Sequence, residues 1–256
     1  MLLSIETLAA LCGFAFLSGF VDAIVGGGGL IQVPALLILV PGAPVATLLG
    51  TNKVASAMGT TAAVIRYSRG RSGQMPVHGE AAGAAFVCSI LGARTVSALD
   101  EALLRPAVLV LLVAVGIYTW RTRDFGSVHA PSIKRGHDIA LAVAVGAVLG
   151  FYDGFFGPGT GSFLIFAFVG VFGFDFLAAT STAKVLNLGS NFAAAVYFTA
   201  TDQVLLAAAI PMGIASIVGA TLGSRLALAR GTRLVRGIFL GVVGALVLKL
   251  GWDLVA

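Results

Sequence analysis

The sequence predicts an all-helical integral membrane protein built from two similar halves. Of its 256 residues, 58% are hydrophobic and only 11% are charged, whereas soluble domains carry about 25% charged residues. The apolar residues form runs, several of them close to the roughly 20 residues that a membrane-spanning helix needs. A glycine-rich break in one of these runs, Gly19–Leu30, also recurs at Gly150–Gly161, 131 residues later. This pattern excludes a soluble domain of useful size.

Five apolar segments are expected in the first half. The second is short, since thirteen residues reach only about 20 Å as a helix, so it either crosses part of the bilayer or lies tilted. The third ends at Arg66 and Arg69, and the fifth is followed by the only long polar stretch, 121–138. The expected segments are 5–24, 29–41, 44–66, 78–97 and 103–120.

The same series of segments restarts after the polar stretch. We therefore expect a first transmembrane repeat at 1–125, a cytoplasmic linker at 126–131 and a second repeat at 132–256. The segments expected in the second half are 139–155, 160–173, 175–199, 203–228 and 233–252.

A comparison of each residue with the one 131 positions later supports the repeat without a gap. Five of the ten positions from 19 to 28 are identical to their counterparts. Later matches are Thr51/Thr182, Lys53/Lys184, Arg94/Arg225 and Arg105/Arg236. A shared apolar composition does not explain the matches between charged residues.

Five segments per repeat is an odd number, so the two halves should be inverted relative to each other in the membrane. Basic residues follow the third segment, occupy the linker and follow the ninth segment. Because loops rich in Lys and Arg stay in the cytoplasm, both termini are expected on the periplasmic side. If the first two segments of each half form a re-entrant hairpin, three crossings remain and the inversion is unchanged.

The two glycine-rich breaks are the expected binding region. Glycine is a poor helix former, and backbone freed from a helix within the bilayer must be buried in protein or line a cavity. Interruptions at matching positions of two halves are a sequence indication of a transporter site. The candidate binding residues in the breaks are Gly26, Gly27, Gly28 and Gly29, and Gly157, Gly159, Thr160 and Gly161.

Lys53 and Lys184 lie about nine residues into their segments, near the middle of the bilayer. An ionisable residue at this depth suggests a functional site by default. We interpret the lysines as an anion site, helped by helix N-termini, which carry free N–H groups and partial positive charge. The alternative is that each lysine pairs with the aspartate of its own half or reaches toward the interface.

Asp22 and Asp153 are the carboxylates in the breaks. They are candidates for proton coupling, because a carboxyl group in this position can bind and release a proton during transport. The alternatives, which the sequence leaves open, are that they cap the broken helices or hold the lysines.

Polar residues accompany the lysines on the same segments. Asn187 and Asn191 follow Lys184 at i+3 and i+7, so all three share one helical face. This stripe suggests a surface that lines the site, although hydrogen bonds between helices explain such residues equally well. The companions are Thr51, Asn52, Ser56, Thr182, Asn187 and Asn191.

These motifs resemble the TauE/SafE family of sulfite and organosulfonate exporters. The first break, followed by Gly50-Thr51-Asn52-Lys53, is similar to the family pattern, and the second break with Thr182-Ala183-Lys184 is similar to its YfcA-like branch. The resemblance covers the whole chain. It implies a permease of the bacterial inner membrane that moves small sulfur-containing anions, with site residues at the matching glycines, Asp22, Asp153, Thr51, Lys53, Thr182 and Lys184.

The alternatives to a transporter are a channel, an assembly factor and an enzyme. A passive anion channel is the nearest alternative, and a non-transporting assembly factor would have little need for matched lysines and aspartates in the membrane. An intramembrane enzyme using Ser162 or Ser181 would lack a membrane-embedded histidine as base. No nucleotide, cofactor or metal motif is present, and nucleic acid is not an expected partner. A homodimer, the substrate and the coupling ion are left open.

Overall fold

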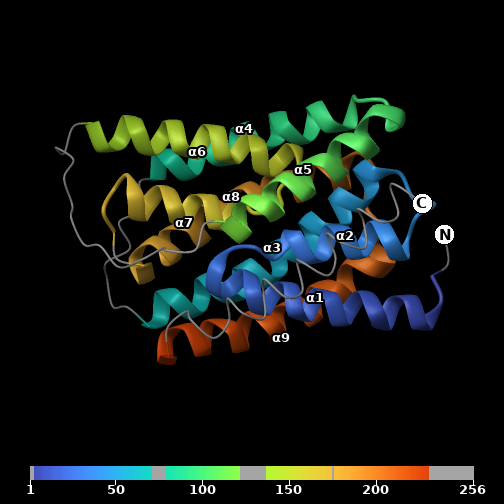
Figure 1. Cartoon of the computed structure of the whole chain (residues 1–256), viewed down its shortest axis with the longest axis horizontal. Helices are drawn as coiled ribbons and strands as arrows, with labels where there is room; N and C mark the ends of the chain where they lie inside the picture. Colours follow the sequence, from blue (N-terminus) through green and yellow to red (C-terminus); the bar gives the residue numbers. More distant parts are fainter. Residues whose placement is uncertain (1–2, 71–78, 122–136, 175, 231–256) are drawn as a thin grey trace.

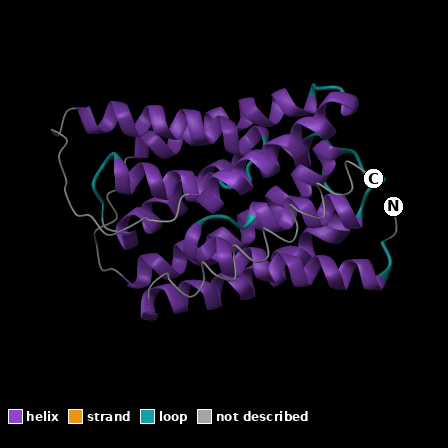
Figure 2. Cartoon of the chain, in the orientation of Figure 1, coloured by secondary structure: helices purple, strands orange, loops and turns teal. Residues whose placement is uncertain are grey.

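The computed structural model describes residues 3–70, 79–121, 137–174 and 176–230. Within these ranges it has nine helices and no strand (Figure 2). Each helix matches an expected segment to within a few residues, which confirms the predicted order. The linker 126–131 and the tenth segment, 233–252, lie outside the described residues. The helices are α1 (Ile5–Val25), α2 (Gly29–Leu39), α3 (Val45–Gly70), α4 (Gly79–Ser97), α5 (Glu101–Arg121), α6 (His137–Phe155), α7 (Thr160–Gly170), α8 (Phe176–Ala200) and α9 (Leu206–Arg230).

The first two helices of each half form a hairpin. Helix α1 runs inward from the N-terminal end of the bundle and α2 returns toward that end, whereas α6 and α7 enter and leave at the opposite end (Figure 1). The turn of the first hairpin begins at Gly26, whose φ of 80° is left-handed and whose N–H donates to the Asp22 carbonyl oxygen. Each half therefore begins with a helical hairpin, and the two hairpins enter from opposite ends of the bundle.

The two halves pack into each other. The long hairpin helix of each half lies against the fourth helix of the other, so that α1 packs on α9 and α6 on α4. In the same way, α3 packs on α9 and α8 on α4, and α3 and α8 contact each other. Exchanging the two halves therefore preserves the main contacts of the described helices.

Glycines allow the closest of these helix pairs. On α6, Gly146, Gly150 and Gly154 are spaced by four residues, and an added Cβ at each would meet the backbone of Ala81, Ala85 or Ser89 on α4. Small residues at this spacing let helix backbones approach in membrane proteins. The glycine pattern of the sequence therefore serves helix packing as well as the two breaks.

The distribution of polarity is inverted relative to a soluble protein. Val87, Val110 and Val148 are more than half exposed, whereas Lys53 and Lys184 are 1% and 0% exposed. By length and composition alone, two described helices qualify as membrane spans, Ile5–Val25 and Leu206–Ala229. Other helices are shorter or carry buried polar residues, which lower their mean hydropathy. An apolar exterior around buried charges is what a bilayer requires.

Candidate functional site

The two glycine-rich breaks meet in the interior of the bundle. The Ser162 N–H donates to the Gly26 carbonyl oxygen at 3.1 Å, and the Ser162 hydroxyl donates to the Val25 carbonyl oxygen at 2.7 Å. The backbones of Gly26 and Gly161 are so close that neither position has room for a Cβ atom. The two predicted breaks therefore form one contact between the halves.

Each membrane lysine forms an ion pair with the aspartate of the other half. Lys53 Nζ lies 2.8 Å from Asp153 Oδ1, and Lys184 Nζ lies 2.7 Å from Asp22 Oδ2. The alternative that each lysine pairs with the aspartate of its own half is therefore wrong. The physical reason is that the breaks meet at the centre, which brings the Lys53 amine against Gly157 in the second break.

The Lys53–Asp153 pair is buried and fully supplied with polar partners. Its side chains are 1% and 2% exposed. Lys53 also donates to Asn191 Oδ1 at 3.2 Å, and the Ser190 hydroxyl donates to Asp153 Oδ2 at 2.6 Å. Buried ionised groups need such partners, because an unpaired buried charge is costly.

The Lys184–Asp22 pair has fewer partners and is less enclosed. Lys184 is fully buried, but the Asp22 side chain is 19% exposed. The second Asp22 oxygen, Oδ1, accepts a long hydrogen bond of 3.3 Å from the Gly28 N–H, just before α2 begins. Asp22 therefore holds a lysine, which is one of the alternatives to a role in proton coupling, whereas helix α2 has no side-chain cap at its first residue.

A small polar cavity lies where these groups converge. Its volume of about 20 Å³ is enough for about one water molecule. Four pairs of its lining residues are related by the 131-residue repeat: Asp22/Asp153, Gly26/Gly157, Ser56/Asn187 and Thr60/Asn191. The remaining lining residues are Gly29, Asn52, Lys53 and Gly161. Both halves thus contribute residues at equivalent positions to this space, although Lys53 lines it and Lys184 does not.

Helix N-termini contribute to this cavity. Helix α2 begins at Gly29 and α7 begins at Thr160, and both Gly29 and Gly161 line the cavity. The first N–H groups of a helix lack partners within the helix and carry partial positive charge. The closed site therefore combines a lysine, two carboxylates, amides, hydroxyl groups and two helix starts.

Several predicted site residues lie outside the cavity lining. The Thr51 hydroxyl accepts the Leu205 N–H at 3.0 Å and so holds the start of α9. The Thr160 hydroxyl donates to the Gly157 carbonyl oxygen within the second break. The Thr182 hydroxyl is buried and has no hydrogen-bond partner in the described part of the chain. Gly27, Gly28 and Gly159 belong to the breaks without lining the cavity, and Lys184 reaches Asp22 but not the cavity itself.

The sequence did not predict two residues of the site, Thr60 and Ser190. The signal for Thr60 was present, since Lys53, Ser56 and Thr60 have the same i, i+3, i+7 spacing as Lys184, Asn187 and Asn191. Ser190 bonds to Asp153, but its repeat counterpart is Gly59. The repeat comparison therefore carries no signal for Ser190.

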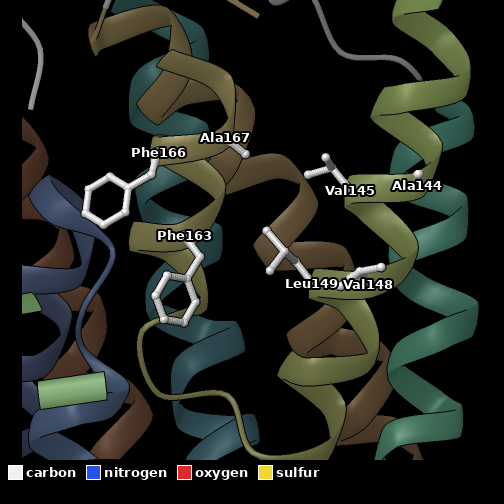
Figure 3. Close-up of a pocket in the computed structure, with 7 residues that line it drawn as sticks. All are labelled: Ala144, Val145, Val148, Leu149, Phe163, Phe166 and Ala167. Carbon is white, nitrogen blue, oxygen red and sulfur yellow. The ribbon is translucent and has the colours of Figure 1, made fainter. Parts of the chain in front are cut away.

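A larger groove of about 480 Å³ lies between α6 and α7, away from the charged residues (Figure 3). Apolar residues alone line it, from Ala144 to Leu149 on α6 and from Phe163 to Ala167 on α7. The polar cavity and not this groove contains the groups that can recognise an ion.

Comparisons with known proteins show the family of this chain. The family model described as "Sulfite exporter TauE/SafE" matches residues 11–250. The chain is 36% identical to "Probable membrane transporter protein ORF9" of a Sinorhizobium species, over 97% of this chain and 94% of that protein. It is 34% identical to "Probable membrane transporter protein YfcA" of Escherichia coli strain K12, over 96% and 90%.

A "Probable membrane transporter protein" of Haemophilus influenzae is 36% identical over 91% of this chain and 90% of its own length. No solved structure matches the chain significantly. A family match over nearly the whole chain, together with relatives at this identity, shows the family. The protein is therefore an integral membrane protein that belongs to the TauE/SafE family and is homologous to YfcA and related probable membrane transporters.

Proposed function

We propose that this protein is a non-enzymatic secondary transporter that carries a small anion across the bacterial inner membrane. The anion binds between the two breaks, near Lys53 and Lys184, and its movement is coupled to protons through Asp22 or Asp153. The crossed ion pairs on either side of a polar cavity carry this proposal. Matched buried charges have a stability cost, and a transport site gives them a purpose.

The halves are proposed to be inverted repeats. The two hairpins enter from opposite ends of the bundle, and the main contacts of the described helices are the same when the halves are exchanged. Arg66, Arg69 and Arg225 lie toward the ends of α3 and α9 that are opposite to the start of α1. By the positive-inside rule, that end faces the cytoplasm and both termini face the periplasm.

Anion binding requires a change in the ion pairs. In the closed site both lysines are neutralised by carboxylates, so an entering anion must displace a carboxylate or arrive when that carboxylate is protonated. Uncompensated charge in the interior costs several kcal/mol, which links binding of the anion to binding of a proton.

A sulfur-containing oxyanion is the proposed substrate class. The family model is named for sulfite export, and sulfite, sulfoacetate and other organosulfonates present the oxygens that a lysine and helix N-termini recognise. A cavity for about one water in the closed state implies that the site expands to admit such an anion.

The test is a thermal-shift screen of the detergent-solubilised protein against sulfite, sulfate, thiosulfate, sulfoacetate, taurine and several carboxylates. A ligand that binds only the folded protein raises the melting temperature according to its concentration and Kd. We expect a shift for a sulfur oxyanion that is lost in Lys184→Ala and in the charge-neutral pair Lys53→Met/Asp153→Asn. The exposed Arg94→Ala variant is the control and should keep the shift.

A shift that survives in both variants would exclude the lysine site. Folded wild-type protein that shows no shift with any anion would contradict the proposed substrate class. Transport by proteoliposomes then separates a carrier from a channel, because counterflow stimulated by anion on the opposite side requires a carrier.

A further inference from the structure

The two aspartates of the site occupy equivalent positions in the repeat but different environments. Both oxygens of Asp153 accept short hydrogen bonds from side chains, 2.8 Å from Lys53 and 2.6 Å from Ser190. Asp22 receives one short bond, 2.7 Å from Lys184, and one long bond of 3.3 Å from the Gly28 N–H. The side chain of Asp153 is 2% exposed and that of Asp22 is 19% exposed.

The partner lysines differ in the same direction. Lys53 is fixed by Asn191 in addition to Asp153, and Asn191 is itself held by the Asn187 carbonyl oxygen at 2.8 Å. Lys184 has Asp22 as its hydrogen-bond partner. Opening the Lys184–Asp22 pair therefore breaks fewer interactions than opening the Lys53–Asp153 pair.

The charged and titratable groups that face Asp22 come from three elements. Lys184 on α8 is in contact with it, and Lys53 and Tyr67 on α3 are close enough to interact electrostatically. Asp153 on α6 lies across the cavity that both carboxylates line. In the described parts of α2 and α7, which also pack near α1, no titratable residue occurs, and Arg225 on α9 is exposed.

We infer that Asp22 is the carboxyl group that exchanges protons, and that it is the site in this protein that a hydrophobic carbodiimide modifies. Asp153 stays the fixed partner of Lys53. This inference assigns the proton step of the proposed function to one of two residues, and its use in transport rests on that function.

The consequence for the anion follows from the charges. A proton bound at Asp22 Oδ2 neutralises the carboxylate, so the Lys184 ammonium loses its counterion while Lys53 keeps its own. A monoanion that enters the expanded site and takes the place of the Asp22 carboxylate beside Lys184 restores neutrality there. The structure thus gives the two lysines different roles: Lys184 takes the exchanging charge, and Lys53 holds the cavity in shape.

The test is labelling of the full-length protein in proteoliposomes with dicyclohexylcarbodiimide, followed by peptide mass spectrometry. A carboxylic acid adds across one C=N bond of the reagent to give an O-acylisourea, which rearranges to a stable N-acylurea. Only the protonated acid reacts in this way. We expect the label on Asp22, with a rate that falls as the pH is raised, and no label on Asp153.

Variants make the result specific. Asp22→Asn should lose the label, and the exposed Ser68→Ala, which leaves both ion pairs intact, should keep it on Asp22. Label on Asp153 in the wild type, or no label on Asp22 at any pH in folded protein, would overturn the inference.

This experiment is independent of the substrate. Anion-dependent thermal shifts without label on Asp22 would leave the transporter proposal in place and refute the proton assignment. Label on Asp22 without any anion response would support the proton assignment and contradict the transporter proposal.

Discussion

The two ion pairs at the centre of the molecule are formed by the same residue types at equivalent positions, yet they are supported differently. The Lys53–Asp153 pair lies among amide and hydroxyl groups of α8. The Lys184–Asp22 pair is held by one long backbone hydrogen bond and is partly open. The charges of the two pairs are the same, and their surroundings differ. A pair that can open beside one that stays closed is useful in a transporter, because only the first has to change partners.

The two hairpins show a similar difference. In the first, the Ser18 hydroxyl on α1 donates to Gln32 Oε1 on α2 at 3.0 Å. The equivalent residues of the second hairpin are Leu149 and Phe163, which line the apolar groove between α6 and α7 (Figure 3). One hairpin is therefore closed by a buried polar contact and the other has an apolar groove between its helices.

The largest effect should come from removing one member of the closed pair. Lys53→Ala leaves Asp153 charged and buried, which costs about 3–5 kcal/mol. Lys184→Ala should cost clearly less, because the Asp22 carboxylate that it leaves behind is partly exposed. Unfolding in mixed micelles measures both losses, and the Lys53→Met/Asp153→Asn variant should recover most of the first. Equal losses for the two lysines would contradict the comparison.

The two breaks should tolerate a glycine-to-alanine substitution unequally. Gly26 and Gly157 both have positive φ, 80° and 96°, where an L-residue costs about 1–2 kcal/mol. An added Cβ at Gly26 also meets the backbone of Gly161, whereas at Gly157 it meets the end of the Lys53 side chain. We expect Gly26→Ala to lower the melting temperature more than Gly157→Ala does.

The control for these glycines is Gly13→Ala on α1, where an added Cβ has no neighbour within 4 Å. That variant should be neutral or slightly stabilising. If Gly26→Ala behaves like this control, the close contact of the two breaks is not required for stability.

Removing the Ser190 hydroxyl group, which donates to Asp153, should make the surroundings of the two ion pairs more alike. Ser190→Ala deletes a 2.6 Å hydrogen bond to the buried carboxylate, and a hydrogen bond to a charged group contributes about 1.5 kcal/mol or more. The exposed Ser68→Ala variant, measured in the same unfolding assay, should change stability very little. A loss no larger than that of Ser68→Ala would mean that another group replaces Ser190.

The smallest effects should come from removing the tyrosine hydroxyl groups that donate to backbone carbonyl oxygens of the breaks. The Tyr67 hydroxyl donates to the Ala23 carbonyl oxygen and the Tyr152 hydroxyl donates to the Pro158 carbonyl oxygen, both at 2.7 Å. Tyr67→Phe should cost about 1 kcal/mol, and Tyr152→Phe less, because Tyr67 is 2% exposed while Tyr152 is only partly buried. The repeat counterpart of Tyr67 is Phe198, so the ring alone already fits this kind of position. A larger loss from Tyr152→Phe would reverse the expected order.

The sequence by itself determined the helices, the breaks and the identity of the central charged residues. Apolar runs and glycine clusters are local signals, so the predicted segments agree with the nine described helices. The 131-residue comparison also identifies Asp22, Lys53, Asp153 and Lys184 as two matched pairs of charged residues, without any information on their positions in space.

Only the tertiary structure decided how these residues pair. A lysine and its partner aspartate are separated by 100 residues in one pair and 162 in the other, and no local periodicity specifies which carboxylate each lysine meets. The answer depends on two hairpins that enter from opposite ends and touch at Gly26 and Gly161. The same arrangement makes Thr51 a support for α9 and brings Ser190 to Asp153, because hydrogen-bond partners are set by which helices cross.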